Sequence, residues 1–154
     1  MPTQEREELL AFEVLGIPRP AGSKRGIPFR RTTGKLGVRL IDDCDRSREW
    51  RQDVQAAAIG ARTGGPLLDC ALLLVVTYQL PRPKGHLNAK GQVRSSAPLH
   101  PTTRPDVLKL TRAIEDALTG IVWVDDSLIV IEVLRKEYIS TSGTPRTRIR
   151  ILRA

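Results

Sequence analysis

The sequence predicts a small α+β domain in which two main helices pack on a mixed, mostly antiparallel sheet. Three observations predict this class: short apolar runs bounded by Gly and Pro, two longer segments with apolar residues at helical spacing, and a final segment that alternates basic and apolar residues. With 154 residues, the chain suits one domain spanning 1–154, because this length buries a sizeable core without disulfides.

The first half of the chain predicts strands around one helix. An apolar run at 11–17 ends in the turn sequence PRPAGSKRG and predicts a strand, and 38–41 predicts another short one. Ser47 is expected to cap a helix that runs to about Arg62, since apolar residues recur there at helical spacing until two glycines and a proline stop it. The apolar run within 69–80 predicts a central strand buried on both faces.

The second half begins with a polar, Pro-rich, basic segment at about 81–103, which is expected to be a flexible loop because it holds too few apolar residues to pack by itself. A helix is expected over 106–119, with Asp106 at or near its N-cap and Gly120 just past its end. Strands are expected over 128–139 and 146–153, the latter with outward arginines that either bind phosphate or are simply solvated.

The charge balance indicates a polyanionic partner. The chain has 25 Lys and Arg against 17 Asp and Glu, a net charge of +8 with a pI near 10.2. Residues 19–39 hold seven cations and no acid, and residues 82–112 hold seven cations and one acid. Such segments are expected to contact phosphates, and a solvated surface loop is the alternative.

The two cysteines, Cys44 and Cys70, have no paired spacing, and the chain opens without a charged region followed by an apolar one. The longest apolar run, 71–76, is too short to cross a bilayer. A reducing cytoplasm and no membrane contact are therefore expected.

The segment RPDVLKLTRAIEDALTGIVWVDDS at 104–127 places one acid at a helix start and an acid pair after a turn, inside basic sequence. Convergent carboxylates beside cations are typical of a metal-dependent phosphodiesterase, in which a bound cation activates water while Lys and Arg hold the phosphate. Leu108 is an exception: it falls on the polar face of the helix, one turn before Arg112, where an acid would make better chemical sense. The alternative for Asp106 is a simple helix cap, and for Asp125 and Asp126 a simple turn.

This pattern resembles the RusA family of Holliday junction resolvases, many of which are carried by phages and prophages. Its motif looks like a basic residue and Pro, then Asp-X-Asp, a Lys or Arg in the helix, Asp-Ala-Leu, a small turn and Asp-Asp-Ser. Here RPD at 104–106, Arg112, DAL at 116–118, Gly120 and DDS at 125–127 match. The GIPRP, SKR and PLHP segments nearer the N-terminus are also similar.

The resemblance implies a structure-selective endodeoxyribonuclease that resolves four-way DNA junctions by metal-dependent hydrolysis, with Mg²⁺ as cofactor and Mn²⁺ as a substitute. It implies a homodimer in the cytoplasm of a bacterial or phage-infected cell. By the same resemblance Asp106 and Asp126 are metal ligands, Asp125 supports them, and Arg112 lies close to the scissile phosphate. The residues expected to bind DNA are Lys24, Arg25, Arg30, Arg31, Arg104 and Lys109.

Leu108 occupies the position of the second acid of Asp-X-Asp, and a leucine cannot bind a metal. The favoured explanation is a catalytically weakened or engineered variant; the other is that a neighbour such as Asp125 or Glu115 supplies the missing oxygen. A protein that binds junctions without cutting them is therefore an alternative function. A basic RNA-binding module is a weaker one, because two Trp, two Tyr and two Phe leave few rings to stack on bases.

Overall fold

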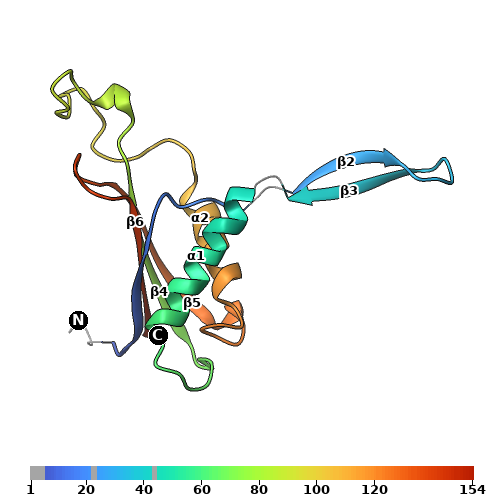
Figure 1. The fold of residues 1–154 in the computed structure, drawn as a ribbon. Helices are drawn as coiled ribbons and strands as arrows, with labels where there is room; N and C mark the ends of the chain where they lie inside the picture. Colours follow the sequence, from blue (N-terminus) through green and yellow to red (C-terminus); the bar gives the residue numbers. More distant parts are fainter. Residues whose placement is uncertain (1–5, 22–23, 43–44) are drawn as a thin grey trace.

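The computed structural model describes residues 6–21, 24–42 and 45–154 and confirms the predicted α+β class. Both α-helices lie on one face of a four-stranded sheet, and a separate two-stranded hairpin projects from this body (Figure 1). The elements in chain order are β1 (Glu8–Leu15), β2 (Lys24–Arg30), β3 (Leu36–Asp42), α1 (Asp45–Ala61), β4 (Leu72–Leu80), η1 (Lys84–His86), α2 (Val107–Leu118), η2 (Asp126–Leu128), β5 (Ile129–Tyr138) and β6 (Arg146–Arg153).

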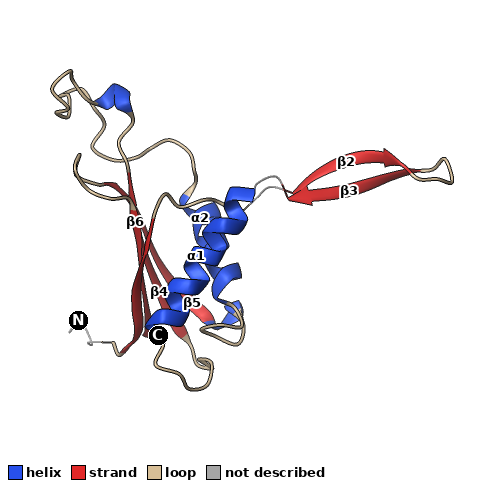
Figure 2. Ribbon diagram, viewed as in Figure 1, coloured by secondary structure: helices blue, strands red, loops and turns tan. Residues whose placement is uncertain are grey.

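The main sheet has the order β1-β6-β4-β5, in which only β4 and β5 run parallel (Figure 2). The mixed, mostly antiparallel sheet is thus confirmed. β4 lies between two neighbours, and its residues Leu72, Leu74, Val76 and Tyr78 are fully buried on the face that the helices cover. The predicted burial on both faces is wrong: Val75, Thr77 and Gln79 on the other face are only half-buried, because the helices cover one face alone (Figure 1).

The helices close the core with the stripes that the sequence predicts. α2 buries Leu110, Ile114, Ala117 and Leu118, whereas α1 buries Trp50, Val54 and Ala58. The turn after α2 adds Trp123, which is fully buried and whose Nε1 donates a 3.0 Å hydrogen bond to Thr119 Oγ1. This turn leads directly into the acid pair, so the core holds the acid pair in place.

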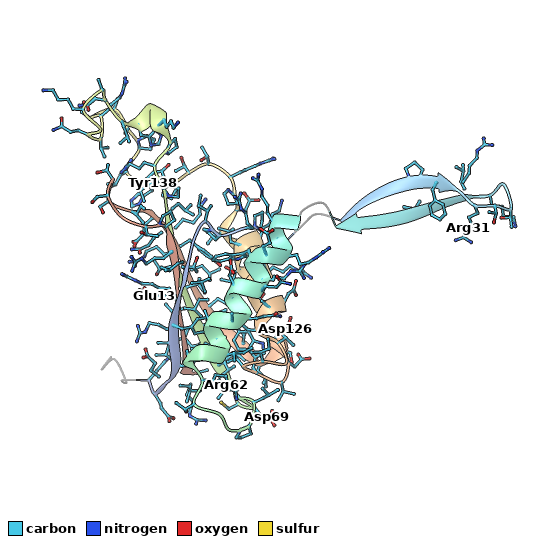
Figure 3. All side chains as sticks on the ribbon, in the orientation of Figure 1. Glu13, Arg31, Arg62, Asp69, Asp126 and Tyr138 are labelled. Carbon is cyan, nitrogen blue, oxygen red and sulfur yellow. The ribbon has the colours of Figure 1, made fainter. Side chains whose placement is uncertain are left out.

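The opposite face of the sheet carries ion pairs between β6 and the N-terminal segment. Arg146 and Arg148 both contact Glu13, at 3.1 and 2.8 Å, and Arg150 contacts Glu8 at 2.6 Å. Figure 3 shows Glu13 on the side of the sheet away from the helices. Each of these arginines already has an acidic partner, which favours a solvated, paired strand face over phosphate binding.

Several predicted boundaries are wrong. β1 is Glu8–Leu15 and not 11–17, because its pairing with β6 begins at Glu8. α1 begins before Ser47, whose Oγ donates to Pro20 O at 3.0 Å, so Ser47 does not cap the helix. β3 is longer than the predicted 38–41 and pairs with β2 along its whole length.

The predicted loop at 81–103 is largely irregular, with the short η1 near its start. Its base packs on Tyr138, whose ring lies 4.3 Å from the Arg82 guanidinium and 5.6 Å from the His86 ring. Cys70 is a free thiol, and Cys44 lies outside the described residues. Within the described ranges, no helix is long and apolar enough to cross a membrane.

Candidate active site

Asp106 stands at the N-terminal end of α2, as predicted, and its carbonyl accepts the first helical hydrogen bond, from Leu110 N at 3.2 Å. Its side chain makes no capping hydrogen bond. The carboxylate is exposed and lies 3.6 Å from Lys109 Nζ. The helix therefore does not use this carboxylate as a cap, and a ligand can reach it.

Two contacts from other elements fix the start of α2. Lys136 of β5 donates through Nζ to the carbonyls of Thr103 and Pro105, each at 3.0 Å. Ala21 N donates to Lys109 O at 3.1 Å, which ties the segment before β2 to the first turn of α2. The sequence reasoning missed Lys136; the alternation along β5, which puts this lysine on the helix-covered face, is the signal that points to it.

The polar face of α2 confirms the predicted place of Leu108, whose side chain is 65% exposed. Arg112 follows one turn later on the same stripe, also exposed, and it makes no ion pair with any residue in the described part of the chain. An apolar side chain is thus exposed to water one turn before an exposed guanidinium.

The acid pair has two different environments. Asp125 precedes η2, and its Oδ1 accepts a 2.8 Å hydrogen bond from Ser127 N. Hydrogen bonds from Ser127 hold the pKa of the Asp125 carboxyl below its usual value. Asp125 is therefore engaged by its own turn, whereas Asp126 is exposed beside it.

The turn that carries the pair is fixed by backbone bonds to the segment before β4. Leu68 N donates to Val122 O at 2.8 Å, and Val124 N donates back to Leu68 O at 3.1 Å. The Arg62 side chain at the end of α1 donates to Ile121 O. Gly120 has a φ of 80°, a conformation in which a residue with a Cβ is strained.

Asp126 is electrostatically coupled to Glu115 of α2, which also hydrogen-bonds the Glu132 side chain of β5. Partial burial, followed by the charges of Glu132 and Asp126, raises the pKa of Glu115 to about 7. Glu115 lies nine residues after Asp106, about 13 Å along the helix axis at about 1.5 Å per residue. Asp126 thus lies beside the C-terminal half of α2.

A divalent metal needs several oxygen ligands on one point. Within 6–21, 24–42 and 45–154, no group of three or more His, Cys, Asp or Glu is placed to hold a metal ion. The convergence of Asp106 and Asp126 on one point stays a prediction.

Comparison with known families decides the lineage of this site. A family model described as endodeoxyribonuclease RusA matches residues 19–152, which is most of the chain. The chain belongs to the RusA family. A protein of Bacillus subtilis (strain 168) described as uncharacterized protein YqaN is 30% identical over 150 residues, which cover 94% of this chain and 96% of that protein. The predicted family is thus confirmed, and with it the class of an endodeoxyribonuclease.

Within the RusA chain, the predicted DNA-binding residues fall into two groups. Arg104 and Lys109 are exposed at the start of α2. Arg30 and Arg31 are exposed on the projecting hairpin, with Arg31 near its far end (Figure 3). Lys24 and Arg25 lie in β2, and their side chains are outside the described part of the structure.

Glu115 gives the RusA domain a pH-dependent stability. A folded-state pKa near 7 is above the unfolded value of 4.5, so folding retains a proton that the unfolded chain releases. Stability from this group is therefore present below about pH 4.5 and declines as pH rises to about 7. Glu115→Gln, which keeps the shape and cannot ionise, should stabilise the fold by about 1 kcal/mol at pH 8, after discounting for solvent screening, and leave it unchanged at pH 4.

Urea unfolding at pH 4 and pH 8 measures this difference. Glu49→Gln, which changes an exposed carboxylate of α1, is the matched control and should alter neither value. An equal effect of Glu115→Gln at both pH values would show that the carboxyl of Glu115 titrates normally.

Proposed function

We propose that this RusA-family protein recognises four-way DNA junctions and that its cleavage of them is impaired by Leu108. The observation that carries the proposal is the exposed Leu108, at the position where the family motif has its second acid, one turn before Arg112, which has no acidic partner among the described residues. A leucine there gains nothing from burial and has no ligand atom. Position 108 therefore lacks the carboxylate of the family motif, while the basic residue of the motif, Arg112, is present one turn later.

The residues that the structure describes do not bring together a complete set of metal ligands. Asp106 and Asp126 are the acids that the family motif assigns to Mg²⁺ or Mn²⁺, but Asp106 begins α2 whereas Asp126 lies beside its C-terminal half. Asp125 Oδ1 accepts the hydrogen bond from Ser127 N, which leaves only its other oxygen for a metal. The missing third carboxylate agrees with the absence of a three-ligand group among the described residues. This donor set is one ligand short, so weak or no cleavage is expected from this chain.

DNA binding depends on basic residues and not on the metal ligands, so the Leu at position 108 should leave it intact. Arg104, Lys109 and Arg112 are exposed around the start of α2, where they would hold the phosphates that flank the cleavage point. Backbone contacts of this kind read the shape of DNA more than its sequence. The partner is therefore branched DNA, in the cytoplasm of a bacterial or phage-infected cell.

A homodimer fits this substrate. A four-way junction has two-fold symmetry, and two copies related by a dyad can address opposing strands of like polarity. We therefore propose that the binding unit is a dimer.

A mobility-shift titration tests the proposal. The chain, in chelator so that no cleavage occurs, is titrated onto a synthetic four-way junction and onto a linear duplex of the same length and composition. We expect at least about tenfold tighter binding of the junction, a difference of about 1.4 kcal/mol. Equal affinities for the junction and the linear duplex would contradict the proposed recognition of junctions. Tighter binding of single-stranded RNA than of either DNA would favour the RNA-binding alternative.

A further inference from the structure

The hairpin of β2 and β3, residues 24–42, stands away from the rest of the molecule (Figure 1). It has only two strands, and none of its described residues belongs to the hydrophobic core. An isolated two-stranded hairpin is marginally stable in water. A projecting arm of this length therefore indicates a surface that it meets outside its own chain.

The chemistry of the arm indicates which surface. Residues 24–42 contain six cations and one acid, a charge of 6 − 1 = +5. Its described side chains also expose apolar groups: Phe29 is 43% exposed, Leu36 77% and Val38 68%. A strongly cationic ribbon with small apolar patches suits a nucleic acid, in which phosphates flank the apolar parts of base edges.

The two faces of the arm differ. Phe29 pairs with Gly37, and a Cβ on that glycine would lie 3.0 Å from two ring carbons, so the ring covers the glycine backbone. Leu36 pairs with Arg30 and Val38 with Pro28. Since opposite residues of an antiparallel pair point the same way, the face that carries Arg30, Leu36 and Val38 is open, with a cation beside its apolar groups.

The arm begins beside the candidate active site. The segment before β2 is tied to the first turn of α2 by the Ala21 N to Lys109 O bond, and Pro20 O accepts from Ser47 Oγ at the start of α1. DNA bound at Asp106 therefore passes the base of the arm. Seven residues per strand extend about 23 Å at about 3.3 Å each, which spans about seven base pairs.

We propose that the β2–β3 hairpin is a β-ribbon that lies in the major groove of the duplex adjoining the cleavage point. The inference rests on the proposed function, and it adds that the hairpin contacts one duplex arm of the junction. The major groove is about 12 Å wide and admits a two-stranded ribbon without deforming the duplex, whereas a ribbon enters the minor groove, about 6 Å wide, only when the DNA is bent or widened. Arg30, Arg31 and Lys35 contact phosphates on the rims of the groove, and the open face with Leu36 and Val38 lies against base edges.

Two variants test the arm. The first replaces 28–38 by Asn-Gly, which joins the paired residues Ile27 and Arg39 through a tight turn. The second, Arg30→Gln/Arg31→Gln/Lys35→Gln, keeps the arm and removes its charge, so the test stands even if the shortened chain fails to fold. Hydroxyl-radical footprints and the salt dependence of binding are measured on junctions with duplex arms of 20 base pairs.

The replacement removes three residues from each strand, about 10 Å at about 3.3 Å each, so we expect the full chain to protect about three base pairs more of one duplex arm than the shortened variant does. Both variants should bind about tenfold more weakly at 0.1 M salt, with a slope of log K against log salt reduced by about 2.7, or about 0.9 for each of three lost phosphate contacts. Methylation of guanine N7, in the major groove, should weaken binding of the full chain.

Unchanged footprints and slopes would overturn the inference. Interference only from methylated adenine N3, in the minor groove, would overturn the groove assignment. A shortened variant that sediments as a smaller species with an unchanged slope would show that the arm holds a second copy. A full chain that binds junction and linear duplex equally would instead refute the proposed function, and the footprint on the linear duplex would still decide the role of the arm.

Discussion

Leu108→Asp is expected to raise junction cleavage in Mg²⁺ or Mn²⁺ by about 100-fold or more, a gain of about 2.7 kcal/mol in transition-state stabilisation. The substituted side chain is 65% exposed on the first turn of α2, two residues after Asp106, so a carboxylate fits there without repacking. It would restore the acid that the RusA motif has at this position and would face Arg112 one turn later.

The same substitution should weaken junction binding when chelator is present. Without metal, an added negative charge close to phosphate repels the DNA, and pairing with Arg112 removes a cation that would otherwise hold a phosphate. We expect about a two- to fivefold loss of affinity, equivalent to about 0.4–1 kcal/mol. If Leu108→Asp lowers the affinity for the junction in chelator but raises the cleavage rate in metal, the new carboxylate acts as a metal ligand. A general increase in affinity would instead raise both.

Leu108→Asn is the matched control, because its amide has nearly the shape of Asp and no charge. It should recover little of the cleavage, since a neutral amide oxygen is a poorer ligand than a carboxylate. Asp126→Asn in the Leu108→Asp background should remove the gained activity. Cleavage by the unmodified chain at the rate of Leu108→Asp would show that position 108 is not a missing ligand.

Most of the main sheet and α2 could be predicted from the sequence because their signals come from burial. β4 is apolar along its length since it lies between two strands, and β6 alternates since one face of it carries the arginines. These signals act over a few residues and do not depend on the rest of the chain. The start of β1 and the role of Ser47 were missed because both depend on partners far along the chain, β6 and Pro20.

The site was predictable as a set of residues but not as an arrangement. Asp106 and Leu108 follow from the helical spacing, and the structure confirms where each lies on α2. The pairing of Glu115 with Glu132 joins residues of two elements, so no local pattern reveals it. For the arm, the sequence predicted a basic segment with turn residues and one short strand at 38–41, because composition shows its charge and turn residues but not that it stands free of the body.

Trp123→Ala is expected to cost about 3–5 kcal/mol of folding free energy, the largest stability effect among the variants considered. The ring is fully buried against the core between α2 and the acid pair, and its removal leaves a cavity that the fixed turn cannot fill. The hydrogen bond from Nε1 to Thr119 Oγ1 is lost as well. Thermal unfolding should show a Tm lower by about 10 °C for a chain of this length.

Two comparisons separate the causes of this loss. Trp123→Phe keeps an aromatic ring but removes the hydrogen bond and part of the buried indole, so it should cost about 1–2 kcal/mol, less than Trp123→Ala. Val124→Ala changes the next residue, which is 52% exposed, and should alter stability by less than about 0.5 kcal/mol. If Trp123→Ala were as mild as Val124→Ala, the core would not be holding the turn that carries Asp125 and Asp126. Those two carboxylates would then be positioned by the hydrogen bonds of the turn, from the Leu68 backbone and the Arg62 side chain.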